Sequence, residues 1–445
     1  MAQTAVTDIS SLIGEMDNEE ILAKRAKYIL PSTVTYYKKP IQLVRGEMQY
    51  LYDEKGKKYL DCFAGVCTVS IGHCHPTWVK AIQDQAAKLF HTTTIYLQPH
   101  LVKMAERLVE KLKPANPDLE VCFFTNAGCE ATELATIIAK NYTGRHEFIA
   151  LRHSFHGRTQ MAMNLTGQSV WRHSTPYAFG VYHAPQNYTY RRPEGMTPKQ
   201  YAESCVHELR ETIKYSTMGK IAAFIGEPIS GFGGTITPEP EFFPGVYAAV
   251  KEADGLYITD EVQTGMGRTG NKFLGIEHWG VKPDIVTMAK GLGNGYPLGA
   301  VITTKKIAAA MQGRIHFNTF GGSPVAMAAG LAVLDVIEKE KLAENSHETG
   351  NYLKDKLTAL MDKCPLIGDV RGMGLMLGVE LVKDRKTKEP AAAELLEVIE
   401  RAKDRGVILG KGGMAGNTIR IKPPMCFTKK DADLTVEVLE ESLKL

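Results

Sequence analysis

The chain has 445 residues, of which 44% are hydrophobic and 23% charged, and its formal net charge is +3. This length and composition predict a globular protein of two or three domains with a large core, and they exclude the disordered and fibrous classes. The nearly neutral charge, without a block of like charges or a basic run interleaved with aromatic residues, argues against a nucleic-acid partner. Because no apolar run of signal or membrane-spanning length occurs, we expect neither secretion nor contact with a membrane.

The eight cysteines are scattered singly, without paired C-x-x-C spacing. This pattern indicates neither a zinc site nor a disulfide framework, so a reducing cytoplasm is the expected location. The run GHCHP at 72–76 places His73 and His75 close together, but no further metal ligands follow at useful spacing and Pro76 is typical of a helix start. We interpret the run as a structural turn and expect no metal.

The predicted elements, in chain order, begin with a hairpin at 50–61, where alternating residues surround a DEKG turn. From about 72 to 325, short β-rich runs alternate with helical stretches, which predicts a mostly parallel sheet covered by helices. The stretch from about 164 to 200 is expected to be an irregular surface excursion. The predicted strands are 121–124, 148–151, 222–226, 256–259, 285–288 and 300–303.

Three regions follow from this order of elements. We expect an N-terminal arm with part of a small domain over 1–71, and a large domain over 72–325. Beyond residue 325, helices and short strands predict the remainder of a smaller α+β domain over 326–445.

Lys290 is the most informative residue, because it follows an apolar strand-like run and precedes three glycines in five residues. Such surroundings are unusual for a surface lysine, which is the ordinary alternative, and they favour a desolvated amine with a lowered pKa. Thirty positions upstream, Asp260 ends another predicted strand. An amine and a carboxylate suit pyridoxal phosphate, whose aldehyde needs a lysine and whose ring nitrogen needs an anionic partner.

A phosphate site is predicted at 123–133, where a strand, a tight turn and a helix start follow one another. Backbone N–H groups at that helix start would face a phosphate, and Gly128 would allow close approach; an ordinary strand-to-helix turn is the alternative. Phe155 precedes a turn and could stack on a pyridine ring or simply lie in the core. The run GMGRTG at 265–270 matches a dinucleotide-binding pattern, but no long helix follows it and no βαβ unit begins the chain, so we expect no nicotinamide site.

These motifs, in this order, resemble the class III aminotransferases, pyridoxal-phosphate enzymes of fold type I, over nearly the whole chain. The resemblance implies an α/β fold in which a large domain with a mostly parallel seven-stranded sheet is joined to a smaller α+β domain. It also implies a homodimer or tetramer with active sites shared across an interface. The motifs are GHCHP (72–76), NAGCEA (126–131), FHGR (155–158), EPI (227–229), DEVQTG (260–265), Lys290 and TFGG (319–322).

The reaction implied by the resemblance is ping-pong transamination from an amino donor to a small 2-oxo acid. Three segments resemble members that use alanine, β-alanine or 3-aminoisobutyrate with pyruvate or glyoxylate. They are TVSIGHCHP (68–76), VRGMGLM (370–376) and TIRIKPPMC (418–426).

The resemblance also implies roles for individual residues. Lys290 would hold the cofactor and move a proton, and Asp260 would pair with the ring nitrogen. Arg420 would bind the substrate carboxylate through two parallel hydrogen bonds, the alternative being a surface ion pair. The other cofactor-binding residues would be Gly128 and Cys129 at the phosphate, Phe155, His156 and Val262 at the ring, Gln263 at the phenolic oxygen and Thr319 at the phosphate of the neighbouring subunit.

Two departures from the family pattern affect these expectations. Most members have Ser-Gly-Ser where this chain has Ala127, Gly128 and Cys129, so a thiol, a weaker donor, replaces a hydroxyl near the phosphate. Phe232 occupies the substrate-binding position where members that use 2-oxoglutarate often carry a glutamate, and we therefore predict a preference for pyruvate or glyoxylate.

Other functions stay open at this point. A different donor such as taurine, 4-aminobutyrate, ornithine or a diamine, with pyruvate or 2-oxoglutarate, would use the same lysine. A phospho-lyase or an aminomutase would use the same cofactor for another outcome. A non-catalytic cofactor-binding protein is disfavoured, because binding alone would not need both Asp260 and Lys290.

Overall fold

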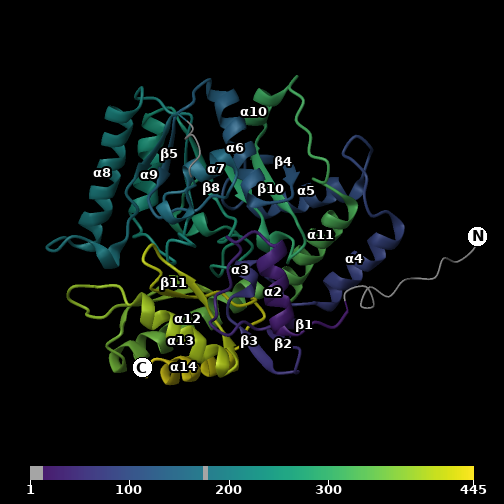
Figure 1. Ribbon diagram of the computed structural model, residues 1–445. Helices are drawn as coiled ribbons and strands as arrows, with labels where there is room; N and C mark the ends of the chain where they lie inside the picture. Colours follow the sequence, from purple (N-terminus) through teal and green to yellow (C-terminus); the bar gives the residue numbers. More distant parts are fainter. Residues whose placement is uncertain (1–13, 174–178, 445) are drawn as a thin grey trace, which may run out of the picture.

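A computed structural model describes residues 14–173 and 179–444. A seven-stranded sheet lies in one half of the molecule, and two four-stranded sheets lie in the other half (Figure 1). The strand order of the large sheet is β4-β10-β9-β8-β7-β5-β6. These strands are β4 (Leu119–Thr125), β5 (Phe148–Leu151), β6 (Val181–Ala184), β7 (Ala223–Gly226), β8 (Leu256–Asp260), β9 (Ile285–Met288) and β10 (Gly299–Thr304).

The large sheet is mostly parallel, as predicted. Strands β5 to β9 pair in parallel, and β10 runs antiparallel to both of its neighbours, β4 and β9. Every residue of β5, β7, β8 and β9 is buried, which is typical of parallel strands covered on both faces.

Strand β6 corrects the expectation that 164–200 is an irregular excursion. It lies within that stretch and pairs in parallel with β5 at the edge of the sheet. The four residues Val-Tyr-His-Ala show neither a continuous apolar run nor clear alternation, so the pattern alone did not reveal a strand.

Helices flank the large sheet, and several begin at a recognisable capping residue or proline. Four of them carry a proline in the first turn, where its missing N–H costs nothing, and the Ser323 and Thr197 side chains cap the helices that follow them. Helix α11, almost entirely apolar, is buried against α4 and α5. The helices are α4 (Pro76–Lys88), α5 (Pro99–Leu112), α6 (Gly128–Thr143), α7 (Gln160–Leu165), α8 (Pro198–Ser216), α9 (Phe242–Glu252) and α11 (Pro324–Lys339).

The N-terminal and C-terminal parts of the chain share a sheet. The predicted hairpin is present as β2 (Tyr50–Asp53) and β3 (Lys58–Asp61), preceded by β1 (Leu43–Glu47), and β13 (Val407–Ile408) joins β3 in parallel. The second four-stranded sheet has the order β11-β12-β15-β14. Its strands are β11 (Ile367–Met373), β12 (Met376–Leu381), β15 (Thr418–Ile421) and β14 (Gly410–Gly412).

Three C-terminal helices pack around these two sheets (Figure 1). They are α12 (Leu342–Lys363), α13 (Ala392–Asp404) and α14 (Lys429–Ser442). The domain limits at 71/72 and 325/326 stay a prediction. Within the described ranges, no helix is both long enough and apolar enough to cross a bilayer.

A turn of left-handed backbone, α3 (Ala64–Cys67), follows β3. All four of its residues have a positive φ between 50° and 66°, although only one is glycine, and such a conformation is unfavourable for L-residues. Asp61 holds the start of the turn, because its Oδ1 accepts hydrogen bonds of 2.8 Å from the backbone N–H groups of Phe63 and Ala64. The turn ends at Cys67, whose thiol lies 3.5 Å from the carbonyl oxygen of Gln263.

Candidate active site

The neighbouring parallel strands β8 and β9 bring Asp260 and Lys290 to one edge of the large sheet. Asp260 is the last residue of β8 and lies opposite Thr287, and Lys290 follows the end of β9. Burial lowers the pKa of the Lys290 amine, although Cys67 and Asp260 act in the opposite direction. No residue in the described part of the chain hydrogen-bonds Nζ, so the amine is not held by another side chain.

Two hydrogen bonds fix the Asp260 carboxylate. Its Oδ2 lies 2.6 Å from Nδ1 of His156, and its Oδ1 accepts a bond of 3.1 Å from the backbone N–H of Val262. Both side chains are buried, and within the described ranges Nε2 of His156 has no hydrogen-bond partner. The arrangement gives a rigid carboxylate that can face a cationic ring nitrogen.

Glu227 joins the two loops beside this pair, and sequence reasoning assigned it no role. Its Oε1 accepts from the backbone N–H of Phe155 at 2.9 Å, and its Oε2 accepts from that of Gly231 at 2.8 Å. Burial raises the pKa of Glu227; among its neighbours, His156 lowers it and Asp260 raises it. The run EPI at 227–229 marked this position only as part of the family pattern.

The predicted phosphate turn lies beside the predicted ring residues. Helix α6 starts at Gly128, and its N-cap residue, Ala127, has no side-chain oxygen to accept from the first-turn N–H groups. A Cβ on Gly128 would lie 3.1 Å from both γ-carbons of Val262, a tight contact that glycine avoids. A Cβ on Gly157 would lie 2.5 Å from Cβ of Cys129, which places Cys129 next to the loop after Phe155.

An aromatic wall made of Phe155, Trp171 and Phe232 borders the site. The Phe155 ring lies 4.7 Å from that of Phe232, and Trp171 lies 5.2 Å from Phe155 and 5.0 Å from Phe232, between ring centroids. The guanidinium carbon of Arg420 lies 4.4 Å from the Phe232 centroid and 5.3 Å from that of Phe63. The wall thus connects the predicted ring-stacking residue to the predicted carboxylate-binding residue.

Arg420 is fully buried, and most of its hydrogen-bonding capacity is unused. Nε donates to the carbonyl oxygen of Lys411 at 2.8 Å, but Nη1 and Nη2 have no hydrogen-bond partner among the described residues. Burial lowers the pKa of Arg420. Because leaving buried donors of a charged group unpaired is costly, a carboxylate that accepts two parallel hydrogen bonds would stabilise this side chain.

Gln263 and Lys422 form a contact that the sequence did not reveal. Nζ of Lys422 lies 3.1 Å from Oε1 of Gln263, and Lys422 is fully buried. The lysine lies two residues after Arg420, and nothing in the run TIRIK distinguishes it from a solvated lysine.

Thr319 differs from the other predicted site residues. It is exposed in the segment before α11 and forms no hydrogen bond with the described residues. The neighbouring Asn318 accepts a bond of 2.9 Å from Nδ2 of Asn126, close to the start of α6.

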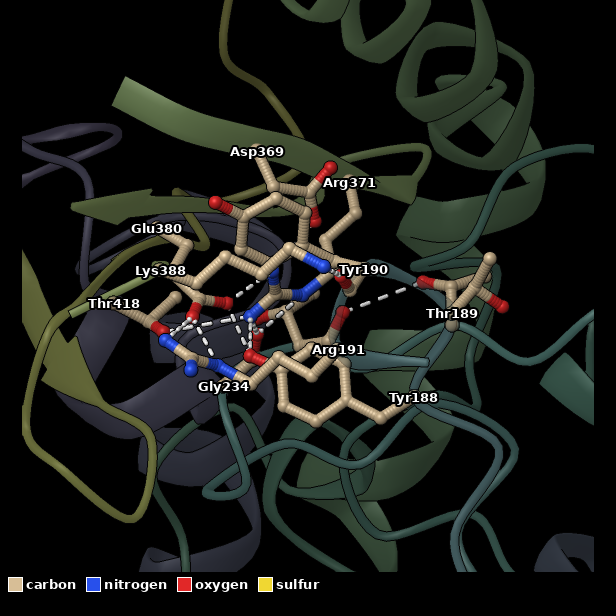
Figure 2. A network of polar contacts seen from close by, with 12 residues as sticks. Tyr188, Thr189, Tyr190, Arg191, Gly234, Asp369, Arg371, Glu380, Lys388 and Thr418 are labelled. Carbon is tan, nitrogen blue, oxygen red and sulfur yellow. Dashed lines mark hydrogen bonds and ion pairs between the residues drawn. The ribbon is translucent and has the colours of Figure 1, made fainter. Parts of the chain in front are cut away.

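A second buried polar network surrounds Glu380 and Arg371 (Figure 2). Glu380 is fully buried and accepts from Nε of Arg191 at 2.8 Å, from Nη1 of Arg371 at 2.7 Å and from the Tyr188 hydroxyl. Burial alone would raise the pKa of Glu380, but Arg371 and the Tyr188 hydrogen bond lower it. Arg371 also donates to the carbonyl oxygen of Gly234 from Nε at 2.9 Å and from Nη2 at 2.7 Å.

Comparison with known proteins agrees with this geometry. The family model of the class-III aminotransferases matches residues 32–443. The chain belongs to the class III aminotransferases. The predicted family and enzyme class are therefore confirmed.

Relatives of this class III aminotransferase match it over most of their length. Alanine–glyoxylate aminotransferase 2 homolog 2, mitochondrial, of Arabidopsis thaliana is 50% identical over 423 residues, which are 95% of this chain and 87% of the relative. Alanine–glyoxylate aminotransferase 2, mitochondrial, of Homo sapiens is 38% identical over 443 residues, which are 95% of this chain and 86% of the relative.

Solved structures confirm the fold of this class III aminotransferase. A Bacillus anthracis aminotransferase is 32% identical and superposes with a TM-score of 0.90, covering 97% of this chain and 100% of that one. An Arthrobacter phospholyase in complex with phosphoethanolamine is also 32% identical, with a TM-score of 0.89 and coverage of 96% and 100%.

Proposed function

We propose that this class III aminotransferase uses pyridoxal phosphate to move an amino group to pyruvate or glyoxylate by a ping-pong mechanism. The donor is a β- or ω-amino acid such as β-alanine or 3-aminoisobutyrate, or alanine. One observation carries the proposal: Lys290 and the fixed Asp260 carboxylate lie in the same buried cluster as Arg420, whose two terminal nitrogens have no partner. The names of the similar alanine–glyoxylate aminotransferases support the choice of acceptor.

The residues fit pyridoxal phosphate. Lys290 would hold its aldehyde, Asp260 its ring nitrogen, and the first N–H groups of α6, at Gly128 and Cys129, its phosphate. The cofactor supplies an electron sink for the carbon that loses a proton. Burial lowers the pKa of Lys290, which favours its amine as the group that takes and returns that proton.

Arg420 and Phe232 define the substrate end of the site. The free guanidinium edge would bind the carboxylate of donor and acceptor in turn. The Phe232 ring, stacked against that guanidinium, occupies space next to the carboxylate and leaves no acidic partner for Arg420 there. This arrangement supports a preference for small acceptors.

A homodimer is supported by exposed apolar residues in two adjacent segments. The His91 and Phe320 rings lie 5.5 Å apart and bring the segments together. Large exposed apolar patches mark contact surfaces. Thr319 lies next to Phe320 in this one, which supports the proposed contact with the phosphate of the neighbouring subunit. The exposed residues are Leu89, Phe90, Ile95, Tyr96, Leu97, Val102, Ile315, Phe317 and Phe320.

The cytoplasmic location stays a prediction. Relatives from Arabidopsis thaliana and Homo sapiens bear the word mitochondrial in their names. Fractionation of cells that produce the natural protein, with marker enzymes for each compartment, would decide between the two locations.

Absorbance spectroscopy tests the proposed reaction. Purified protein with added pyridoxal phosphate is titrated with β-alanine or 3-aminoisobutyrate, and then with pyruvate or glyoxylate. We expect the visible band of the lysine-bound cofactor to disappear with the amine and to return with the oxo acid. A band that none of these amines removes would contradict the proposed donors, and the lack of any band would contradict the proposed function.

A phospho-lyase is the second candidate, because the Arthrobacter phospholyase superposes so closely. Its reaction would release phosphate from phosphoethanolamine without an added oxo acid. Phosphate release under those conditions, at a rate above that of transamination, would favour this candidate.

A further inference from the structure

The site contains a second buried lysine besides Lys290. Lys422 directly follows β15, and its backbone N–H donates to the carbonyl oxygen of Cys62 at 2.8 Å. Its side chain is fully buried, and Nζ lies 3.1 Å from Oε1 of Gln263 and 3.4 Å from the carbonyl oxygen of Gly231. Both acceptors are neutral oxygens, which is unusual because buried lysines are normally paired with a carboxylate.

The surroundings of Lys422 disfavour a positive charge on its amine. Burial, reinforced by the positive charges of Arg420 and Lys290, lowers the pKa of Lys422 well below its ordinary value. Cys67 and Glu227 act in the opposite direction. Burying an amine costs free energy, and packing alone would not offset this cost. We therefore look for a function in the two hydrogen bonds that Lys422 forms.

The contact determines how the Gln263 amide is oriented. A glutamine amide has an acceptor end and a donor end, and an amine N–H that points at it must face the oxygen. The amide lies flat against Gly231, where a Cβ would be only 2.3 Å from Nε2, so it has little room to turn. With Oε1 bonded to Lys422, the two N–H donors of Nε2 have no partner in the described part of the chain.

We propose that Lys422 is a positioning residue, which holds the Gln263 amide so that its two N–H donors are left for the phenolic oxygen of the cofactor. The inference rests on the proposed function, since it needs pyridoxal phosphate in this site. Lys422 also holds the carbonyl group of Gly231, whose N–H is held by Glu227. The same lysine therefore steadies the loop that carries Phe232.

Direct binding of the substrate carboxylate by Lys422 is the competing explanation. The amine already donates to two protein oxygens, whereas the terminal nitrogens of Arg420 donate to none. The two explanations differ in what they predict for the enzyme without substrate: only a positioning role changes the cofactor's own titration.

The test compares the wild type with Lys422→Met, Gln263→Leu and the double variant, each purified with added pyridoxal phosphate. The visible band of the lysine-bound cofactor is followed from pH 6 to pH 10 without substrate. Donors at the phenolic oxygen favour its ionised form, so losing them raises the pH at which the band titrates. We expect Lys422→Met and Gln263→Leu each to raise it by about one unit.

The double variant is expected to titrate like Gln263→Leu alone, because the two residues act as a unit. Lys430→Met, which removes an exposed lysine from α14, is the matched control and should titrate like the wild type. If Lys422→Met is insoluble, Lys422→Gln, which is neutral and one bond shorter, should shift the titration in the same direction.

Two results would overturn the role of Lys422. They are an unshifted titration in Lys422→Met and shifts that simply add in the double variant. An unshifted titration together with a raised KM for carboxylate substrates would instead support direct binding of the substrate by Lys422. In each of them the wild type still shows its band, so the proposed function stands. A wild type without any band would instead remove the proposed function, and this inference with it.

Discussion

At the scale of single residues, Arg420 combines a buried charge with two terminal nitrogens that lack partners. We expect Arg420→Met to lower kcat/KM for β-alanine and for pyruvate roughly 100-fold, because two charge-assisted hydrogen bonds to the carboxylate are lost. Steady-state kinetics would measure this, with a carboxylate-free amine such as propylamine as the reference donor. An equal loss with propylamine would show that Arg420 has another role.

We expect Phe232 to influence the choice of acceptor at the same end of the site. Replacing the ring by alanine removes the group stacked on Arg420 at 4.4 Å and makes room for a longer acceptor. We expect Phe232→Ala to raise the ratio of kcat/KM for 2-oxoglutarate over pyruvate about tenfold, the size of effect typical of one apolar pocket group. Phe179→Ala, at an exposed aromatic residue, is the control, and a wild type that already prefers 2-oxoglutarate would refute the prediction.

Lys422 has a consequence for stability as well as for orientation. Its pKa is lowered in the folded protein, whereas in the unfolded chain it is about 10.4. Between these values the unfolded chain binds one more proton, so this residue makes the wild type more stable as the pH rises. We expect Lys422→Met to be the more stable protein at pH 7, by a margin that shrinks towards pH 10.

Urea unfolding at pH 7, 8 and 9 would measure that margin, with Lys430→Met as the exposed control. A margin that does not change with pH would mean that Lys422 keeps its ordinary pKa in the folded protein.

Some of these site residues could be recognised from the sequence, and others could not. Lys290 and Asp260 could be found because each ends a recognisable apolar strand, and adjacent parallel strands bring their ends together. Lys422 and Glu227 could not, because a polar residue within a short strand or turn is expected to be solvated unless its surroundings are known. The left-handed turn at 64–67 was also missed, since only Gly65 signals a positive φ there.

At the scale of elements, the network around Glu380 ties β11 and β12 to the loop at 188–191 of the large sheet (Figure 2). Glu380→Gln removes the charge that balances Arg371 and Arg191 inside the protein. We expect a loss of about 3 kcal/mol in the free energy of unfolding, as is typical when one partner of a buried ion pair is removed.

Chemical denaturation would measure this loss, and Glu252→Gln is the matched control. Glu252 forms a pair with Arg210 at the surface, so that change should cost less than about 1 kcal/mol. Equal losses in the two variants would contradict the importance of the buried network.

Strand β6 is the strand of the large sheet that could not be recognised from the sequence. The six strands recognised from the sequence are central or strongly apolar, whereas β6 is short, lies at an edge and pairs with β5 alone. The pairing of β6 depends on where β5 lies in space, and the sequence pattern of β6 itself carries no information about that position.

At the scale of the whole molecule, the patch formed by 89–102 and 315–320 is expected to join two copies of the chain. Leu97 and Ile315 are almost fully exposed within it. We expect the double variant Leu97→Asp and Ile315→Asp to become monomeric and to lose most of its activity, because charges are excluded from the centre of such interfaces.

Light scattering after gel filtration would measure the mass. Met218→Asp, at an equally exposed apolar residue outside the patch, should remain a dimer. A dimer that survives the double change would place the interface elsewhere.

The loop around Phe232 is held through its carbonyl groups by the C-terminal part of the chain. Lys422 holds Gly231, the backbone N–H of Gly413 donates to Phe232 at 2.9 Å, and Arg371 holds Gly234. If Phe232 determines the acceptor as proposed, its effect depends on contacts from the C-terminal part of the chain. A chimera that receives only residues 229–234 from this enzyme should fail to inherit its acceptor preference, whereas one that also receives 367–421 and Lys422 should inherit it.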